Sequence, residues 1–159
     1  MFNTFSELVL DYTGTLSVDG RLLPGIAERL TALAQSFCIS VITSNTFGTA
    51  KSQLDGIPVQ LIVMSTGEAK LDIVRQICPA KVTAIGNGRN DVPMMREAGL
   101  RNAVIGQEGA AAELLQFTNI VVTDICHALD LIINPLRLKK RLRDWARNIV
   151  HDNEEKLRF

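Results

Sequence analysis

The chain has 159 residues, of which 47% are hydrophobic and 21% are charged, and its 17 basic and 17 acidic residues leave no net charge. This length and apolar content predict one domain with a full core and exclude an intrinsically disordered chain. No apolar run approaches the roughly 20 residues that a membrane-spanning helix needs, so we expect no membrane span.

The cysteines and histidines form no metal-binding pattern. Cys38, Cys78 and Cys126 are widely spaced without a CxxC pair, and the only histidines are His127 and His151. This pattern argues against a structural zinc site. The few cysteines, and an N-terminus that lacks the features of a signal peptide, predict a cytoplasmic protein. We expect all three cysteines to lie in or near the core.

Strand-like and helix-like segments alternate along the chain. The strands are apolar runs without strict alternation, which is typical of strands buried on both faces. Short connections between strands and helices predict an α/β fold with a doubly wound, Rossmann-like parallel sheet and helices on both faces. In chain order, the pattern predicts a strand at 8–10, a helix at 23–35, a strand at 38–42, a helix at 48–55, a strand at 59–64, a helix at 67–77, a strand at 81–85, a helix at 92–98, a strand at 103–105, a helix at 110–117, a strand at 120–122 and a helix at 125–132.

Charge divides the chain into two parts. Residues 1–134 carry 9 basic and 13 acidic side chains, whereas residues 135–159 carry 8 basic and 4 acidic ones. We predict a single core domain at 1–134 and a basic amphipathic helical tail at 135–159 that docks on this domain or on a second subunit. Binding of the tail to nucleic acid or to an acidic membrane has less support, because the main domain is not basic. The apolar face of the tail comprises Leu138, Leu142, Trp145, Ala146 and Ile149.

Polar residues follow the predicted strands at the points where these strands end. They are Asp11, residues 43–45, Lys70 in the helix after the third strand, and residues 86–91. The carboxyl ends of parallel strands meet at one edge of the sheet, where ligands bind. A carboxylate nucleophile with hydroxyl groups and a lysine suits phosphoryl transfer, and carboxylate, amide and carbonyl oxygens suit Mg²⁺.

Four segments, in order, resemble the motifs of the haloacid dehalogenase-like (HAD) phosphotransferase superfamily. They are DYTGTLS at 11–17, ITSN at 42–45, Lys70, and GNGRNDVPMMREA at 86–98. The first segment is most similar to the DKTGTLT of P-type cation ATPases, and the chain resembles the small soluble P-type-ATPase-like HAD proteins. The resemblance implies a HAD-like fold. Because residues 17–23 leave room only for a small hairpin flap, we expect a capless protein.

The resemblance implies a nucleophile and a metal site. Asp11 would become an aspartyl phosphate, and the Thr13 backbone carbonyl would bind Mg²⁺ together with Asp11. Asn87 and Asp91 would complete the metal site, with Asp91 binding directly or through water and Asn90 in support. The turn at Asn90 and Asp91 also has a purely local explanation, since these residues are good helix caps.

The resemblance also implies a phosphate-binding set. Thr43 would hydrogen-bond the phosphoryl group, and its neighbour Ser44 is the alternative for this role. Asn45 and Gly14 would complete the set. Lys70 would steady both the nucleophile and the phosphoryl charge. The alternative for Lys70 is an ordinary solvated lysine on a helix surface.

Two positions depart from the pattern of the superfamily. Thr13 stands where most HAD phosphatases have a second aspartate, which protonates the leaving group and activates water. General acid–base help of that kind contributes about 10²–10⁴-fold, so we expect slow turnover. Asn87 stands where an aspartate usually binds Mg²⁺, and it brings no charge to the ion.

These residues predict a slow Mg²⁺-dependent phosphatase that acts on a phosphorylated substrate through phospho-Asp11. Two alternatives remain open, and Thr13 and Asn87 are the features that favour them. One is a P-type-ATPase-like phosphoacceptor with a long-lived acyl phosphate, and the other is a non-enzymatic module that binds a phosphorylated ligand or partner. An open, capless site also suggests a homo-oligomer in which a neighbouring subunit closes the site.

Overall fold

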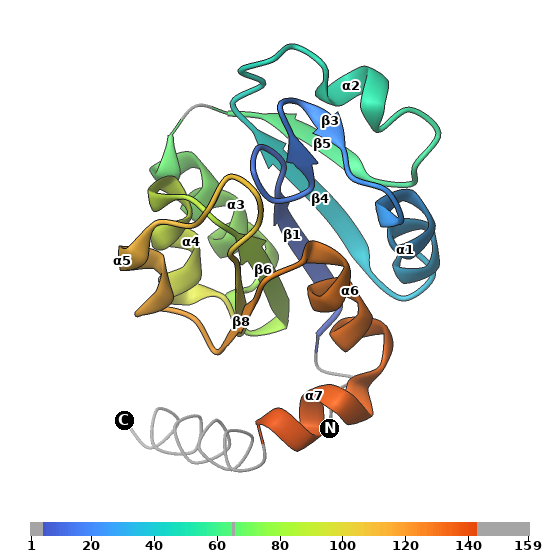
Figure 1. Cartoon of the computed structure of the whole chain (residues 1–159). Coiled ribbons are helices and arrows are strands. Elements are labelled where there is room, and N and C mark those ends of the chain that lie inside the picture. Colours follow the sequence, from blue (N-terminus) through green and yellow to red (C-terminus); the bar gives the residue numbers. More distant parts are fainter. Residues whose placement is uncertain (1–4, 65, 143–159) are drawn as a thin grey trace.

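A computed structural model of the protein describes residues 5–64 and 66–142. Its centre is a six-stranded sheet in the order β5-β4-β1-β6-β7-β8, in which every neighbouring pair is parallel (Figure 1). This arrangement confirms the predicted α/β fold. The strands are β1 (Glu7–Asp11), β4 (Cys38–Thr43), β5 (Gln60–Val63), β6 (Val82–Gly86), β7 (Leu100–Val104) and β8 (Ile120–Val122).

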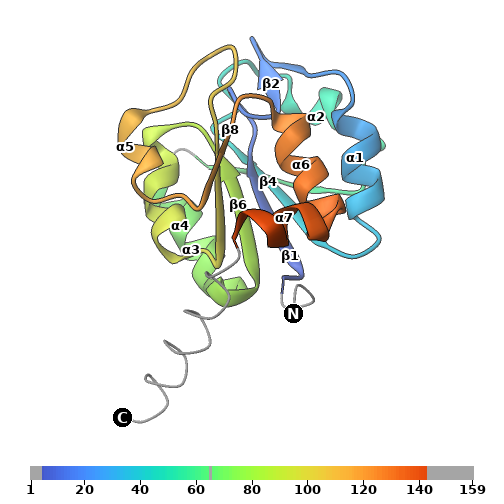
Figure 2. The ribbon, with the colours of Figure 1, turned by 60° about the horizontal axis from the view of Figure 1, so that its bottom comes forward.

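Helices cover both faces of the sheet, as the unbroken apolar runs predict. Figure 2 shows α1 and α6 side by side on one face and α3 and α4 on the other. Leu8 and Leu10 of β1 face the first layer, whereas Val9 faces the second, and all three are fully buried. The helices are α1 (Ile26–Leu33), α2 (Ala50–Gln53), α3 (Gly67–Ile77), α4 (Val92–Glu97), α5 (Ala112–Leu115), α6 (Ile125–Ile133) and α7 (Pro135–Arg141).

A two-stranded hairpin follows β1 and replaces any larger cap. β2 (Ser17–Val18) pairs antiparallel with β3 (Arg21–Leu22), and no cap domain interrupts the described residues after it. The buried hydroxyl of Tyr12 donates to the Gly20 carbonyl, and the Thr49 hydroxyl donates to the same oxygen. The expected capless hairpin flap is therefore confirmed, and it is anchored to the segment that leads into α2.

Some element boundaries differ from their predicted positions for local reasons. α1 begins at Ile26 rather than at residue 23, because Gly25 at its N-cap has a φ of 82°. β7 begins three residues earlier than predicted, since Leu100 and Arg101 pair with β6. The cysteine prediction is wrong at two positions. Cys38 is exposed at the amino end of β4, and Cys78 is exposed where α3 ends.

The tail is described only in part. α7 follows α6 directly and buries Leu138, the first member of the predicted apolar face. Trp145, Ala146 and Ile149 lie outside the described residues. No helix in residues 5–64 or 66–142 combines the length and apolar character that a membrane crossing needs.

Candidate active site

The sequence-predicted polar residues gather at the carboxyl edge of the sheet. β1 ends at Asp11 and lies in register with β4, so that Asp11 stands beside Ile42 and close to Thr43. β6 ends at Gly86 and leads directly into the fourth motif. A cavity of about 330 Å³ opens at this edge, lined by Asp11, Thr13, Gly14, Ser44, Asn87, Gly88, Asn90 and Glu108.

Lys70 joins two carboxylates beneath this cavity. Its Nζ donates to Oδ1 of Asp11 at 2.7 Å and to Oδ1 of Asp91 at 2.6 Å. All three side chains are at least 93% buried. α3 places the lysine in its first turn, and the Thr66 hydroxyl caps this helix by accepting from the Ala69 N–H. The alternative of a solvated surface lysine is therefore excluded.

Asp91 is enclosed by hydrogen bonds on both of its carboxylate oxygens. Oδ2 accepts from the backbone N–H groups of Asn87 and Gly88, at 3.1 and 2.9 Å, and Oδ1 is held by Lys70. The carboxylate thus fixes the turn that precedes the 3₁₀ helix Arg89–Asp91 and also anchors the lysine. Asp91 makes no side-chain cap bond to α4, so capping of that helix does not account for it. Asp91 lies behind the cavity rather than on its wall.

Burial and charge set the protonation of this cluster. The pKa of Asp11 is raised to about 7, first by burial and then by the charge of Asp91, although Lys70 and Thr15 act in the opposite direction. Burial lowers the pKa of Lys70, but the carboxylates of Asp11 and Asp91 outweigh this effect and raise it above its ordinary value. The lysine therefore stays charged, while Asp11 exchanges its proton near neutral pH.

Thr15 orders the side of Asp11 that faces away from the lysine. Its hydroxyl lies 3.1 Å from Oδ2 of Asp11 and 3.2 Å from Oδ1 of Asn87, and its single hydrogen serves one of them at a time. Thr15 was not among the predicted site residues. The available signal was its place in the DYTGTLS segment, on the turn that carries Asp11 and Thr13.

The loop after β7 is attached to Asn87. The Asn87 side-chain amide donates to the Gly109 carbonyl at 3.1 Å, and the Ala111 N–H donates to the Asn87 carbonyl at 2.8 Å. This attachment brings Glu108 to the cavity wall. Sequence reasoning missed Glu108, although its position beyond the end of a strand was the same signal that selected the other residues.

The second motif presents Ser44, not Thr43, to the cavity. Thr43 is fully buried, and its Oγ1 accepts from the Asn45 N–H at 2.9 Å. Ser44 lines the cavity, and its hydroxyl lies 2.9 Å from that of Thr46. Asn45 adopts a φ of 56°, and its Oδ1 is buried without a partner among the described residues. Thr43 therefore shapes the turn that presents Ser44.

Gly14 allows the first and fourth motifs to approach each other. Its φ is +75°, and a Cβ at this position would lie 2.4 Å from Nδ2 of Asn87. We expect Gly14→Ala to lower the free energy of unfolding by roughly 2–4 kcal/mol, through strain and displacement of Asn87. Gly56→Ala is the matched control, because Gly56 has the same φ with nothing near its missing Cβ. Urea unfolding of both variants measures the difference, and equal losses would contradict the close contact at Asn87.

The atoms around the cavity suit a hard cation. The carboxylates of Asp11 and Glu108 and the amide oxygen of Asn87 belong to the oxygen donors that Mg²⁺ prefers. Within residues 5–64 and 66–142, no three His, Cys, Asp or Glu side chains cluster tightly enough to hold a metal by themselves. A cation here would therefore need amide, carbonyl and water oxygens as well, as Mg²⁺ commonly does.

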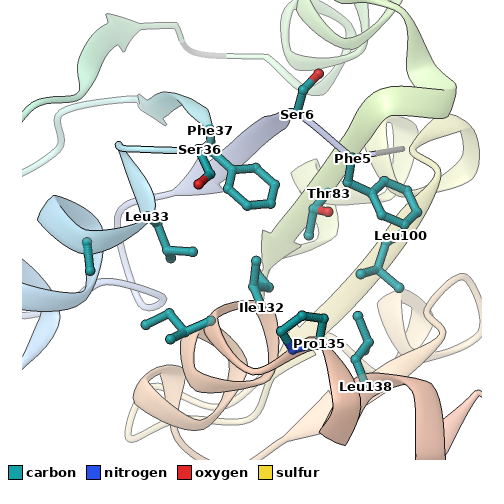
Figure 3. Close-up of a pocket in the computed structure, with 12 residues that line it drawn as sticks. Phe5, Ser6, Leu33, Ser36, Phe37, Thr83, Leu100, Ile132, Pro135 and Leu138 are labelled. Atoms are coloured by element: carbon teal, nitrogen blue, oxygen red, sulfur yellow. The ribbon is translucent and has the colours of Figure 1, made fainter. Parts of the chain in front are cut away.

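A second pocket, of about 490 Å³, lies at the opposite end of the sheet and carries no titratable side chain. Figure 3 shows Thr83 and Leu100 on the strands facing Ile132, Pro135 and Leu138 across it. This pocket therefore lacks the carboxylates and the lysine that gather at the carboxyl edge.

Two curated proteins are similar to this chain in sequence. The uncharacterized protein MJ0073 of Methanocaldococcus jannaschii is 44% identical over 80 residues, which cover 48% of this chain and 86% of that protein. The phospholipid-transporting ATPase NEO1 of Saccharomyces cerevisiae is 29% identical over 99 residues, which cover 60% of this chain but only 8% of the ATPase. No protein-family model matches the sequence.

Solved structures of phosphatases share the fold. A 3-deoxy-D-manno-octulosonate 8-phosphate phosphatase from Moraxella catarrhalis, in complex with magnesium and phosphate ions, superposes with a TM-score of 0.70 at 16% identity over 94% of both chains. The cobalt-bound phosphatase of this type from Haemophilus influenzae gives a TM-score of 0.70 at 14% identity, covering 84% of this chain and 90% of the other.

Proposed function

We propose that this chain, which belongs to the same family as the Methanocaldococcus jannaschii protein and has the HAD fold, is a Mg²⁺-dependent phosphohydrolase that acts through an aspartyl phosphate on Asp11. The observation that carries the proposal is the buried contact of Lys70 with Asp11 and Asp91 below an open polar cavity. A module that only binds a ligand has no need to hold a buried carboxylate between a lysine and an open cavity.

The chain's own groups account for the formation of the acyl phosphate. A carboxylate oxygen of Asp11 attacks phosphorus, and the bond from phosphorus to the leaving oxygen breaks. Lys70 holds the carboxylate in place and offsets the negative charge that gathers on the phosphoryl oxygens. The Ser44 hydroxyl lines the cavity and would donate to those oxygens. Water then cleaves the acyl phosphate, releasing phosphate and regenerating Asp11.

Mg²⁺ would be held by Asp11, the Thr13 carbonyl and Asn87, and when bound it would neutralise phosphoryl charge and orient the substrate. Asp91 would support the ion from behind, because its two oxygens already bond to Lys70 and to the turn at Asn87 and Gly88. Asn90 lines the same cavity and would contact the ion's water shell. The magnesium in the Moraxella catarrhalis phosphatase supports a divalent metal in this fold.

A second candidate, a phosphoacceptor with a long-lived acyl phosphate, is favoured by Thr13. A threonine cannot protonate the leaving group or activate water as a carboxylic acid does. The sequence similarity to a P-type ATPase agrees with this candidate. The slow phosphatase and the phosphoacceptor differ only in how quickly water cleaves phospho-Asp11.

We further propose that the substrate enters an open site. The hairpin β2–β3 is the only covering segment that the described residues place after β1, so a large phosphorylated substrate has access. The proposal also includes a second subunit that closes the site. It further includes a tail at 135–159 that is attached to the core domain. The burial of Leu138 supports the attachment.

The test is phosphate release from p-nitrophenyl phosphate and acetyl phosphate, with Mg²⁺ and with EDTA in its place. We expect release that requires Mg²⁺. In parallel, an acid quench with labelled acetyl phosphate would reveal a hydroxylamine-sensitive phosphoprotein. Strong labelling with little release identifies the phosphoacceptor. If a panel of phosphomonoesters gave no phosphate release and no labelled phosphoprotein, this result would contradict both candidates.

A further inference from the structure

We infer that Glu108 supplies the metal-site charge that Asn87 lacks. This inference rests on the proposed Mg²⁺-dependent function. Among the side chains on the cavity wall, only Asp11 and Glu108 are carboxylates. Asp11 already faces Lys70, whose charge offsets its own. Because Lys70 is shared between Asp11 and Asp91, these three groups together carry only one negative charge, and Glu108 would add a second near a divalent cation.

The position of Glu108 is set by Asn87 itself. The side-chain amide of Asn87 donates to the Gly109 carbonyl, next to Glu108 in the chain, and the Asn87 carbonyl accepts from Ala111. An aspartate at position 87 could not make the first of these bonds, because a carboxylate does not donate to a carbonyl. Asn87, the neutral residue of the fourth motif, therefore attaches the loop that carries Glu108.

Gly14 shows how close the two side chains lie. The point where a Cβ of Gly14 would stand is 2.4 Å from Nδ2 of Asn87 and 3.2 Å from Oε2 of Glu108. Both atoms thus border the same small space beside the first motif. A cation bound at Asp11 and Asn87 would have the Glu108 carboxylate at its side, in contact directly or through one water.

The test measures Mn²⁺ binding by electron paramagnetic resonance, without substrate, so that affinity is read independently of activity. For Glu108→Gln we expect about five- to tenfold weaker binding, the size that a partly screened charge near a divalent ion gives. Thermal unfolding should be unchanged because the substitution is isosteric. The matched control is Glu113→Gln, which removes an exposed carboxylate that pairs with Arg89 and does not line the cavity. It should change the affinity less than twofold.

A double variant tests whether a carboxylate at position 87 can replace the one at position 108. Asn87→Asp combined with Glu108→Gln returns the carboxylate to position 87, and we expect Mn²⁺ affinity within about twofold of the wild type. Equal affinities of the wild type and Glu108→Gln would overturn the inference, as would an equal loss in Glu113→Gln. If the wild type binds Mn²⁺ and Glu108→Gln weakens it, but no phosphate is released, the inference stands and the proposed hydrolysis fails. If the wild type hydrolyses phosphomonoesters while Glu108→Gln binds Mn²⁺ normally, only the inference fails.

Discussion

Asp11→Asn is expected to lower Mg²⁺-dependent phosphate release at least about 10³-fold, and to abolish the hydroxylamine-sensitive phosphoprotein. An amide oxygen is a poor nucleophile, and the substituted side chain would still occupy the space between Lys70 and Thr15. Release from p-nitrophenyl phosphate and acid-quench labelling are the two measurements. Residual release within tenfold of the wild type would remove Asp11 as the nucleophile.

The same variant should keep its fold, and its stability should depend less on pH. In the unfolded chain Asp11 loses its proton near its ordinary pKa of 3.8, whereas burial raises the pKa in the folded protein to about 7. Between these values the folded state binds the extra proton, so this group makes the wild type less stable as pH rises from 4 to 7. Asparagine does not titrate. At pH 8 we therefore expect Asp11→Asn to be more stable than the wild type by roughly 1–4 kcal/mol in urea unfolding.

That pH comparison also serves as the folding control for the loss of activity. An inactive variant that unfolds at the same or a higher urea concentration has lost chemistry and not structure. A variant that is less stable than the wild type at pH 8 would contradict the unfavourable burial of the Asp11 carboxylate.

The fold was predictable because the order of apolar and polar residues along the sequence indicates its strands and helices. Apolar runs such as 8–10 and 38–42 indicated buried parallel strands, and the polar residues that follow them indicated the edge that carries the site. Boundaries were less predictable, because they depend on individual backbone angles such as the φ of Gly25. The exposure of Cys38 and Cys78 depends on where an element ends, and hydropathy does not report this.

The sequence predicted which edge of the sheet gathers most of the polar residues, but not all of the cavity-lining residues or their contacts. The motifs identified Asp11, Lys70 and Asp91, but spacing alone could not show that the lysine contacts both carboxylates. Thr15 and Glu108 were missed for different reasons. Thr15 stands inside a recognised segment without a role of its own. Glu108 follows the end of a strand, but the hydrogen bonds of its loop with Asn87 that bring it to the cavity connect residues far apart in the sequence.

The second large effect is expected for Lys70→Met, which removes the cation between two buried carboxylates. At pH 8 we expect a loss of roughly 3–5 kcal/mol in the free energy of unfolding, because the charges of Asp11 and Asp91 then face each other without compensation. The loss should be smaller at pH 5, where Asp11 binds a proton in the folded state. Urea unfolding at the two pH values measures both losses.

Two further variants separate this electrostatic effect from a loss of packing. Lys51→Met removes an exposed lysine from α2 and should change stability by less than about 0.5 kcal/mol at either pH. Lys70→Met combined with Asp11→Asn leaves a single buried carboxylate, so we expect it to recover a large part of the stability that Lys70→Met loses at pH 8. If the double variant recovered nothing, or if Lys70→Met lost the same stability at pH 5 and pH 8, the lysine would act through its methylenes. The charge that it places between the nucleophile and the fourth motif would then have no part in stability.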